Sequence, residues 1–192
     1  MPKKNRENVS DILRTQKVNK PKIEDVIPVY LDGDMRKIAL DFAAYMRENK
    51  MQPVWCLSNA WKAVYKGKCI CYIRMPSGPY DNQFDQPRMP EGDRSRNFWV
   101  VTPYLNHISE YEWVIMEEGL HDLISENLYR CNSCHPDRDD CALHRKDTRT
   151  ILGNEVNGLC WGRPAYWFWN PGEAEINCIK RLLELEKKAR TE

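Results

Sequence analysis

Four of the eight cysteines in this 192-residue chain lie within one short segment, and they constrain its fold more than any other feature. Cys131 and Cys134 have the C-x2-C spacing with which a tight turn directs two thiolates at one metal ion. Cys141 and Cys160 follow and supply two more thiolates. Structural zinc is tetrahedral and favours sulfur ligands, so these four cysteines predict a closed zinc site. Such a site stabilises a fold and leaves no open position for catalysis.

Two histidines are alternative ligands, because a set of three cysteines and one histidine also binds zinc. His144 competes with Cys160 as the fourth ligand, and His135 lies in the same segment. Several Lys and Arg residues surround the cysteines in the sequence, and their charge would stabilise the thiolates. If no metal binds, the four cysteines are free thiols of a small subdomain.

The length and composition favour one cytoplasmic domain. The chain is 42% hydrophobic, which is enough for a substantial core, and no apolar run approaches the length of a bilayer span. No signal-peptide core follows Met1, so we expect a reducing cytosol, where clustered cysteines are typical metal ligands. Residues 1–22 carry seven Lys or Arg against two acidic residues. They predict a basic, flexible arm before a single domain at 23–192, with the zinc knob at about 130–162.

Hydrophobic periodicity predicts an α+β fold, in which helices pack on an antiparallel sheet beside a small cysteine-rich, metal-binding knob. Helices are expected at 32–49, at 109–128 with a break near Gly119, and from Asn170 onwards. Strands are expected at 27–31, 53–57, 60–65, 69–75, 98–104, 148–152, 156–159 and 165–169. Pro28 would confine the first strand to a sheet edge. In the last helix, Glu186 and Arg190 have the i,i+4 spacing of a solvent-side ion pair.

Both faces of the last predicted strand are aromatic. Trp167 and Trp169 share one face, and Tyr166 and Phe168 share the other. Three interpretations stay open, namely core packing, an aromatic ligand cleft, and a platform that stacks the bases of single-stranded nucleic acid. The polar loop 76–96 is then a lid over a cleft or a disordered insertion. The candidate ligand-binding residues are Trp61, Trp99, Trp167, Trp169, Tyr80 and Arg96.

The other cysteines are predicted to be structural. Regular alternation places Cys69 and Cys71 on one strand face, with Cys56 in a neighbouring run, so we expect a small reduced thiol cluster that packs like a hydrophobe. Cys178 is expected on the core face of the last helix. Motifs of zinc deaminases, di-iron proteins, phosphate-binding loops and serine hydrolases are incomplete or missing from the sequence, which favours a non-catalytic protein.

The run from Trp61 to Ile73, WKAVYKGKCICYI, and the run Phe98-Trp-Val-Val101 resemble the strand hairpins of small uncharacterised bacterial α+β proteins of the YdhG and YjbR type. The cysteine-rich segment 131–160, with Thr150-Ile-Leu-Gly and Asn170-Pro171, is similar to a tail on proteins of this general kind. The resemblance covers residues 35–190. It implies a fold built on an antiparallel sheet, and it implies no activity.

These features predict a zinc-stabilised binding or regulatory domain for a small ligand or a protein partner, with no membrane partner. One alternative is a nucleic-acid-associated regulator that uses the basic arm and the aromatic surface. A second alternative is an enzyme of unknown class, which would need a cluster of titratable groups in a cleft.

Overall fold

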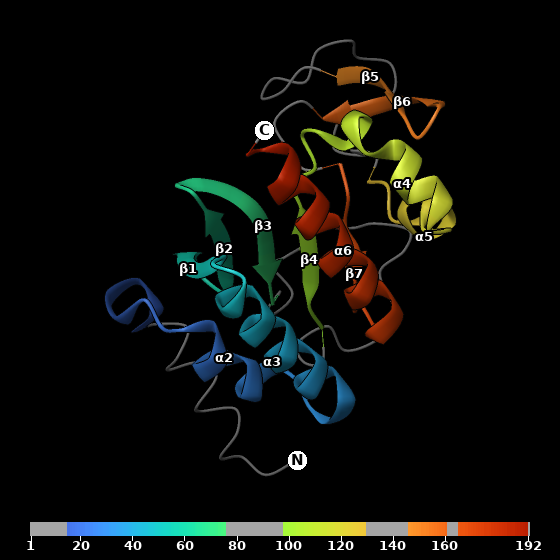
Figure 1. The fold of residues 1–192 in the computed structure, drawn as a ribbon. Coiled ribbons are helices and arrows are strands. Elements are labelled where there is room, and N and C mark those ends of the chain that lie inside the picture. The colour runs from blue at the N-terminus through green and yellow to red at the C-terminus, as the bar shows by residue number, and fades with distance from the viewer. Residues whose placement is uncertain (1–14, 76–97, 130–145, 161–164, 192) are drawn as a thin grey trace.

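The computed structural model describes residues 15–75, 98–129, 146–160 and 165–191. It has the predicted α+β fold, and its centre is a five-stranded antiparallel sheet in the order β1-β2-β3-β4-β7 (Figure 1). The strands of this sheet are β1 (Gln52–Leu57), β2 (Ala60–Tyr65), β3 (Lys68–Arg74), β4 (Val100–Pro103) and β7 (Phe168–Trp169). A second, two-stranded sheet consists of β5 (Lys146–Ile151) and β6 (Asn154–Cys160). The helical segments are α2 (Ile23–Tyr30), α3 (Gly33–Glu48), the 3-10 turn η2 (Ile108–Glu110), α4 (Glu112–Glu117), α5 (His121–Glu126) and α6 (Glu173–Ala189).

Two tight turns join neighbouring strands as hairpins. Lys66 and Gly67 connect β2 to β3 with φ angles of 47° and 79°. A two-residue loop with both residues in this left-handed region follows the twist of the flanking strands, and glycine adopts the region without strain. The same geometry recurs at Leu152 and Gly153, with φ angles of 50° and 73°, between β5 and β6.

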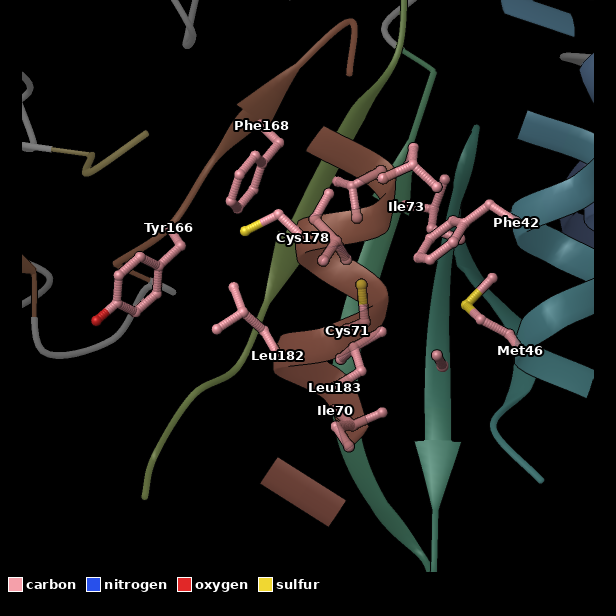
Figure 2. Packing of buried hydrophobic residues seen from close by; sticks show 14 of the residues in the cluster. Phe42, Met46, Ile70, Cys71, Ile73, Tyr166, Phe168, Cys178, Leu182 and Leu183 are labelled. Carbon is pink, nitrogen blue, oxygen red and sulfur yellow. The ribbon is translucent and has the colours of Figure 1, made fainter. Parts of the chain in front are cut away.

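The core lies on the face of the central sheet that α3 and α6 cover (Figure 1). Phe42 of α3 and Leu182 of α6 are fully buried on this face, and Figure 2 shows them near Ile73 of β3 and Phe168 of β7. Full burial of each such side chain stabilises the fold by about 1.5–3 kcal/mol. Cys178 is buried in the same cluster, as predicted.

The strand expected at 27–31 is wrong, because this segment belongs to helix α2 and the extended residue Leu31 that follows it. Ile23, Val26, Ile27 and Tyr30 are all buried. Their spacing of i, i+3, i+4 and i+7 is that of a helix face packed on a core. Pro28 is tolerated near the end of the helix, where its missing N–H removes one backbone hydrogen bond and the Leu31 N–H still donates to the Ile27 carbonyl at 2.9 Å.

A β-bulge corrects the expectation that Cys69 and Cys71 share one strand face. Ala63 pairs with Cys71 and Val64 pairs with Cys69, so one residue of β3 is inserted between two adjacent pairs. Cys71 is therefore buried in the core, whereas Cys69 is half-buried on the other face.

The helical region predicted at 109–128 is divided at Gly119, which has a φ of 67°. Glycine ends α4 because a left-handed residue satisfies the last carbonyls of a helix, and here the Gly119 N–H donates to the Met116 carbonyl at 3.2 Å.

The predicted strand 165–169 is shorter than expected, since β7 spans two residues and Tyr166 forms an isolated bridge with Leu128.

Residues 15–22, which the sequence places in the flexible arm, contact the central sheet. Gln16 is 1% exposed. Its Nε2 donates to Asn59 Oδ1 at 2.5 Å, and its Oε1 accepts the Asn59 backbone N–H at 2.7 Å. Because Asn59 has a φ of 56° in the β1–β2 turn, Gln16 stabilises a left-handed residue. Trp61 Nε1 also donates to the Pro21 carbonyl at 2.9 Å.

Candidate functional site

The candidate site is the face of the central sheet opposite α3 and α6, which we call the open face. Residues that pair directly across antiparallel strands point to the same side of a sheet, so two rows of paired residues define this face. One row consists of Val54, Lys62, Tyr72 and Thr102, and the other consists of Ala60, Arg74, Val100 and Trp169. Ala60, Val100 and Thr102 are buried, so the other residues of the two rows supply the exposed surface of this face. In the described part of the chain, the helices that cover the sheet lie on its other side (Figure 1).

The charged residues in the strands of the central sheet are all basic. Its five strands contain Lys62, Lys68 and Arg74, and they contain no Asp or Glu. Lys62 and Arg74 are half-buried members of the open face. Lys62 therefore gives this face a positive charge that attracts anions, whereas Arg74 already has an interaction partner within the protein.

Two thiols lie beside these cations. Burial raises the pKa of Cys56 and of Cys69, and the charge of Lys62 offsets part of this rise in both cases. Burial also raises the pKa of Tyr72, and the neighbouring Cys69 adds to this rise. The thiols are therefore protonated at neutral pH, and protonated thiols are weak nucleophiles. This part of the open face offers packing surface and hydrogen-bond donors.

Aromatic rings occupy two separate places on the open face. Tyr72 and Tyr104 form a tilted pair with ring centroids 5.5 Å apart. At the β7 edge, Trp169 stacks on Phe98 with centroids 5.6 Å apart, and it contacts Trp167 with centroids 5.3 Å apart. Tyr72 and Trp169 are half-buried, so each ring keeps exposed surface while its neighbours restrict its orientation. Rings held in this way suit contacts with flat, apolar ligands.

A buried carboxylate fixes the end of the sheet that adjoins Cys69 and Tyr104. Glu186 of α6 is 0% exposed, and it accepts hydrogen bonds from Tyr111 Oη at 2.9 Å, Arg190 Nε at 2.8 Å and the His107 backbone N–H at 3.1 Å. His107 Nδ1 lies 2.9 Å from Glu186 Oε1. Burial by itself would raise the pKa of Glu186, and the hydrogen bonds from His107, Arg190 and Tyr111 lower it below its ordinary value.

Arg190 connects this carboxylate to the open face. Its guanidinium donates to the Cys69 carbonyl at 3.1 Å and to the Tyr104 carbonyl at 3.3 Å, and so holds the adjoining ends of β3 and β4. The prediction that Glu186 and Arg190 form a solvent-side pair is wrong, because their side chains are 0% and 8% exposed. Tyr111, which helps to enclose this pair from outside α6, lies 75 residues from Glu186 in the sequence. The helical spacing of Glu186 and Arg190 therefore does not reveal the contact.

The predicted ligand-binding residues fall in three places. Trp61 and Trp99 are 0% exposed and belong to the core between the sheet and its helices. Trp167 and Trp169 belong to a second cluster, on the side of the open face, together with Phe98 and Tyr129. Tyr80 and Arg96, with the loop 76–96, lie outside the described residues. Ligand binding by these six residues stays a prediction.

Lys62 and Tyr72, which sequence reasoning did not select, form the middle of the open face. The signal that could have found them is present in the sequence, since both occupy alternating positions of hairpin strands that lack acidic residues. The face on which they lie follows from the positions of α3 and α6, and the sequence alone does not show it.

The predicted zinc ligands are described in part. Cys160 is the last residue of β6 and pairs with Lys146, the first residue of β5. Cys131, Cys134, Cys141, His135 and His144 lie outside the described residues. Across the ranges that the structure describes, no group of three or more His, Cys, Asp or Glu side chains is placed to hold a metal ion. The zinc site stays a prediction.

Comparison of the chain with protein-family models, with curated proteins and with solved structures finds no match. The resemblance to bacterial proteins of the YdhG and YjbR type therefore stays a prediction. Among the described residues, every helix is too short or too polar to cross a membrane.

Proposed function

We propose that the protein is a non-catalytic binding module whose open face takes up an anionic ligand or an anionic surface of a partner. The observation that carries this proposal is the composition of the central sheet, whose five strands contain three cations and no acidic residue. Lys62 and Arg74 both lie on the face opposite the helices, and the proposal relies on Lys62, because Arg74 already has an interaction partner within the protein. Half-buried charges bind anions more strongly than fully solvated charges do, because less water screens the interaction.

The groups of the open face suit binding better than catalysis. Burial raises the pKa of both thiols, Cys56 and Cys69, so neither is an activated nucleophile at neutral pH. The buried Glu186 is committed to Tyr111 and Arg190 and serves to position the strand ends. The function of this face therefore rests on charge, shape and aromatic contact.

The proposal includes a structural zinc ion held by Cys131, Cys134, Cys141 and Cys160, with His144 as the alternative to Cys160. Backbone contacts at both ends of the cysteine-rich segment support it. The Tyr129 N–H donates to the Ala165 carbonyl at 2.7 Å, and Lys146 pairs with Cys160. The chain therefore enters segment 130–145 beside Ala165 and leaves it beside Cys160. Cys56, Cys69, Cys71 and Cys178 are free thiols, which fits a reducing compartment such as the cytosol.

Titration with inorganic tripolyphosphate, followed by amide chemical shifts in NMR spectra, tests the binding function. We expect the amides of Lys62, Tyr72 and Arg74 to shift and the amides of α3 to stay unchanged. Lys62→Gln should weaken the effect. Lys37→Gln removes the same charge from an exposed position of α3, on the other side of the sheet, and should leave it unchanged. The absence of shifts in β2 and β3, or an equal effect of the two variants, would contradict the proposal.

A further inference from the structure

We propose that helix α4 carries a second binding surface, on which a basic segment of a partner protein docks with an arginine side chain over the Trp113 indole. In Figure 1, α4 lies beside α6 and the β5–β6 hairpin. Hydrogen bonds agree with this placement, because Arg181 of α6 donates to Glu118 and the Leu152 N–H of the β5–β6 turn donates to Glu112. This surface is therefore separate from the open face and adds to the proposed anion binding.

Two large apolar side chains of α4 face the solvent. Trp113 is 67% exposed and Met116 is 56% exposed. Because they are three residues apart in one helix, their side chains are neighbours on its outer side. Tryptophan and methionine are enriched in the buried centres of protein interfaces, where they supply contact area. The pair therefore marks a surface that a partner protein can cover.

Contacts on the inner side hold α4 in place. Ile115 is 0% exposed and belongs to the core. Before it in the helix, Glu112 Oε1 accepts the Leu152 N–H at 2.7 Å. At the end of the helix, Glu118 accepts hydrogen bonds from Arg181 Nε at 2.9 and 3.0 Å. The helix is thus already ordered in the free protein, so a partner that binds its outer side has less conformational entropy to remove.

The charge around Trp113 is negative. Residues 98–129 contain no Lys or Arg, and their six acidic residues are Glu110, Glu112, Glu117, Glu118, Asp122 and Glu126. Glu110 and Glu117 are exposed, and they lie three residues before and four residues after Trp113. Within the described part of the chain, neither carboxylate forms an ion pair. An exposed indole with an unneutralised carboxylate on each side attracts a cation.

The position of Glu117 gives a separate reason to expect a cationic partner. Glu117 is the last residue of α4, and the last turn of this helix has no basic residue. The carbonyl groups at the end of a helix carry a partial negative charge, so a carboxylate there is unfavourable for the helix. Glu118 is compensated by Arg181, whereas Glu117 is not. A cation from a partner would supply the missing compensation.

These charges select one kind of partner. Nucleic acids and anionic membranes would be repelled by Glu110 and Glu117. A second copy that used the same surface would place these carboxylates against their own counterparts, which disfavours the contact. Arginine suits the site better than lysine does, because its planar guanidinium stacks on an aromatic ring and also donates hydrogen bonds to carboxylates.

An NMR titration of the full-length protein with an oligoarginine of about four residues tests the inference. Such a peptide reaches roughly 13 Å when extended, and Glu110 and Glu117 are about 10 Å apart along the helix. We expect shifts of the Trp113 indole N–H and of the Met116 and Glu117 amides, whereas the amides of β2 stay unchanged. The affinity should fall as salt rises, and an oligolysine of equal length should bind more weakly.

Matched variants separate stacking from charge. Trp113→Leu should weaken binding about 2- to 5-fold, whereas Trp113→Tyr keeps an aromatic ring and should retain most of the affinity. Glu117→Gln should also weaken binding. Its control is Glu48→Gln, because Glu48 is the exposed last residue of another helix, α3, and this variant should bind like the natural protein. Neither glutamine variant should melt at a lower temperature, since each removes a carboxylate from the end of a helix.

The outcomes decide between the possible partners. Shifts confined to the region of α4 that Trp113→Leu and Glu117→Gln weaken, and that Glu48→Gln leaves unchanged, support the proposal. The absence of shifts, unchanged affinity of Trp113→Leu, or equal effects of the two glutamine variants would overturn it. Equal binding of oligolysine would overturn the stacked arginine. A dimer in analytical ultracentrifugation that Trp113→Leu abolishes would assign the surface to a second copy and would also overturn the basic partner.

Discussion

Replacement of Glu186 by glutamine removes the charge from a carboxylate that is 0% exposed and surrounded by hydrogen-bond donors. Tyr111 Oη, Arg190 Nε and the His107 backbone N–H all point at its two oxygens, at 2.8–3.1 Å. In Glu186→Gln, one of these oxygens becomes an NH2 group that faces donors, and the Arg190 guanidinium loses its counter-charge in a site where its side chain is 8% exposed. Breaking one partner of a buried ion pair costs about 3–5 kcal/mol.

This loss is large beside the total stability of a domain, which is about 5–15 kcal/mol. For a chain of this length, the melting temperature should fall by roughly 6 to 20 °C in thermal denaturation followed by circular dichroism. The control is Glu118→Gln, because Glu118 also forms a two-bond pair with an arginine, Arg181, in an exposed position. Exposed pairs contribute less than about 1 kcal/mol. If the two variants melt within a degree or two of each other, the reasoning about the buried network is refuted.

The acid side of the stability profile gives a second readout of Glu186. Its pKa in the folded protein is below the ordinary value of 4.5, so folding favours the charged carboxylate. The stability that it contributes is fully present above pH 4.5 and is lost as the pH falls through the lower pKa of the folded state. The difference in unfolding free energy between natural protein and Glu186→Gln should therefore narrow below that pH. If this difference in unfolding free energy stays constant with pH, protonation of Glu186 is not coupled to folding.

Three further results are expected. Gln16→Ala removes the hydrogen bonds of Gln16 to two polar groups of Asn59 and should cost about 2–4 kcal/mol of stability in urea denaturation. A chain that begins at Ile23 should lose at least as much stability, whereas a chain that begins at Thr15 should not. Equal stability of all these proteins would contradict the contact. Elemental analysis should find one zinc per chain. The double variant Cys131→Ser, Cys134→Ser should lose the zinc and melt at a lower temperature, and full metal content in this variant would exclude these ligands. Burial raises the pKa of Cys178 to about 12, so iodoacetamide near pH 8 should modify this residue after unfolding and spare it in the native protein, as peptide mass spectrometry would show; rapid native modification would place the thiol at the surface.

The hairpins of the central sheet could be predicted from the sequence because their signals are local. The Lys66-Gly67 turn needs left-handed residues at two adjacent positions, and alternation in β2 and β3 defines two strands around it. The helices α3 and α6 follow in the same way from apolar residues at a spacing of 3.6. These signals depend on residues that are close in the chain, so they can be recognised without knowledge of the fold.

The run around Ile27 shows why local patterns fail for short segments. Ile27 and Leu31 belong to an alternating pattern, whereas Ile23, Ile27 and Tyr30 belong to a helical one, and eight residues do not separate the two. Packing on the core favours the helix, because in that conformation Ile23, Val26, Ile27 and Tyr30 are buried together.

Local patterns in the sequence are enough to predict the α+β class, the hairpins and the long helices of the described residues. Tertiary structure decided that Glu186 and Arg190 are buried, since Tyr111 and His107 reach them from a distant part of the chain. It also decided that the row of Lys62 and Tyr72 is the open face, while Trp61 and Trp99 fill the core. Alternation divides the residues of a strand between two faces, and the helices that pack on one of them determine which face meets the solvent.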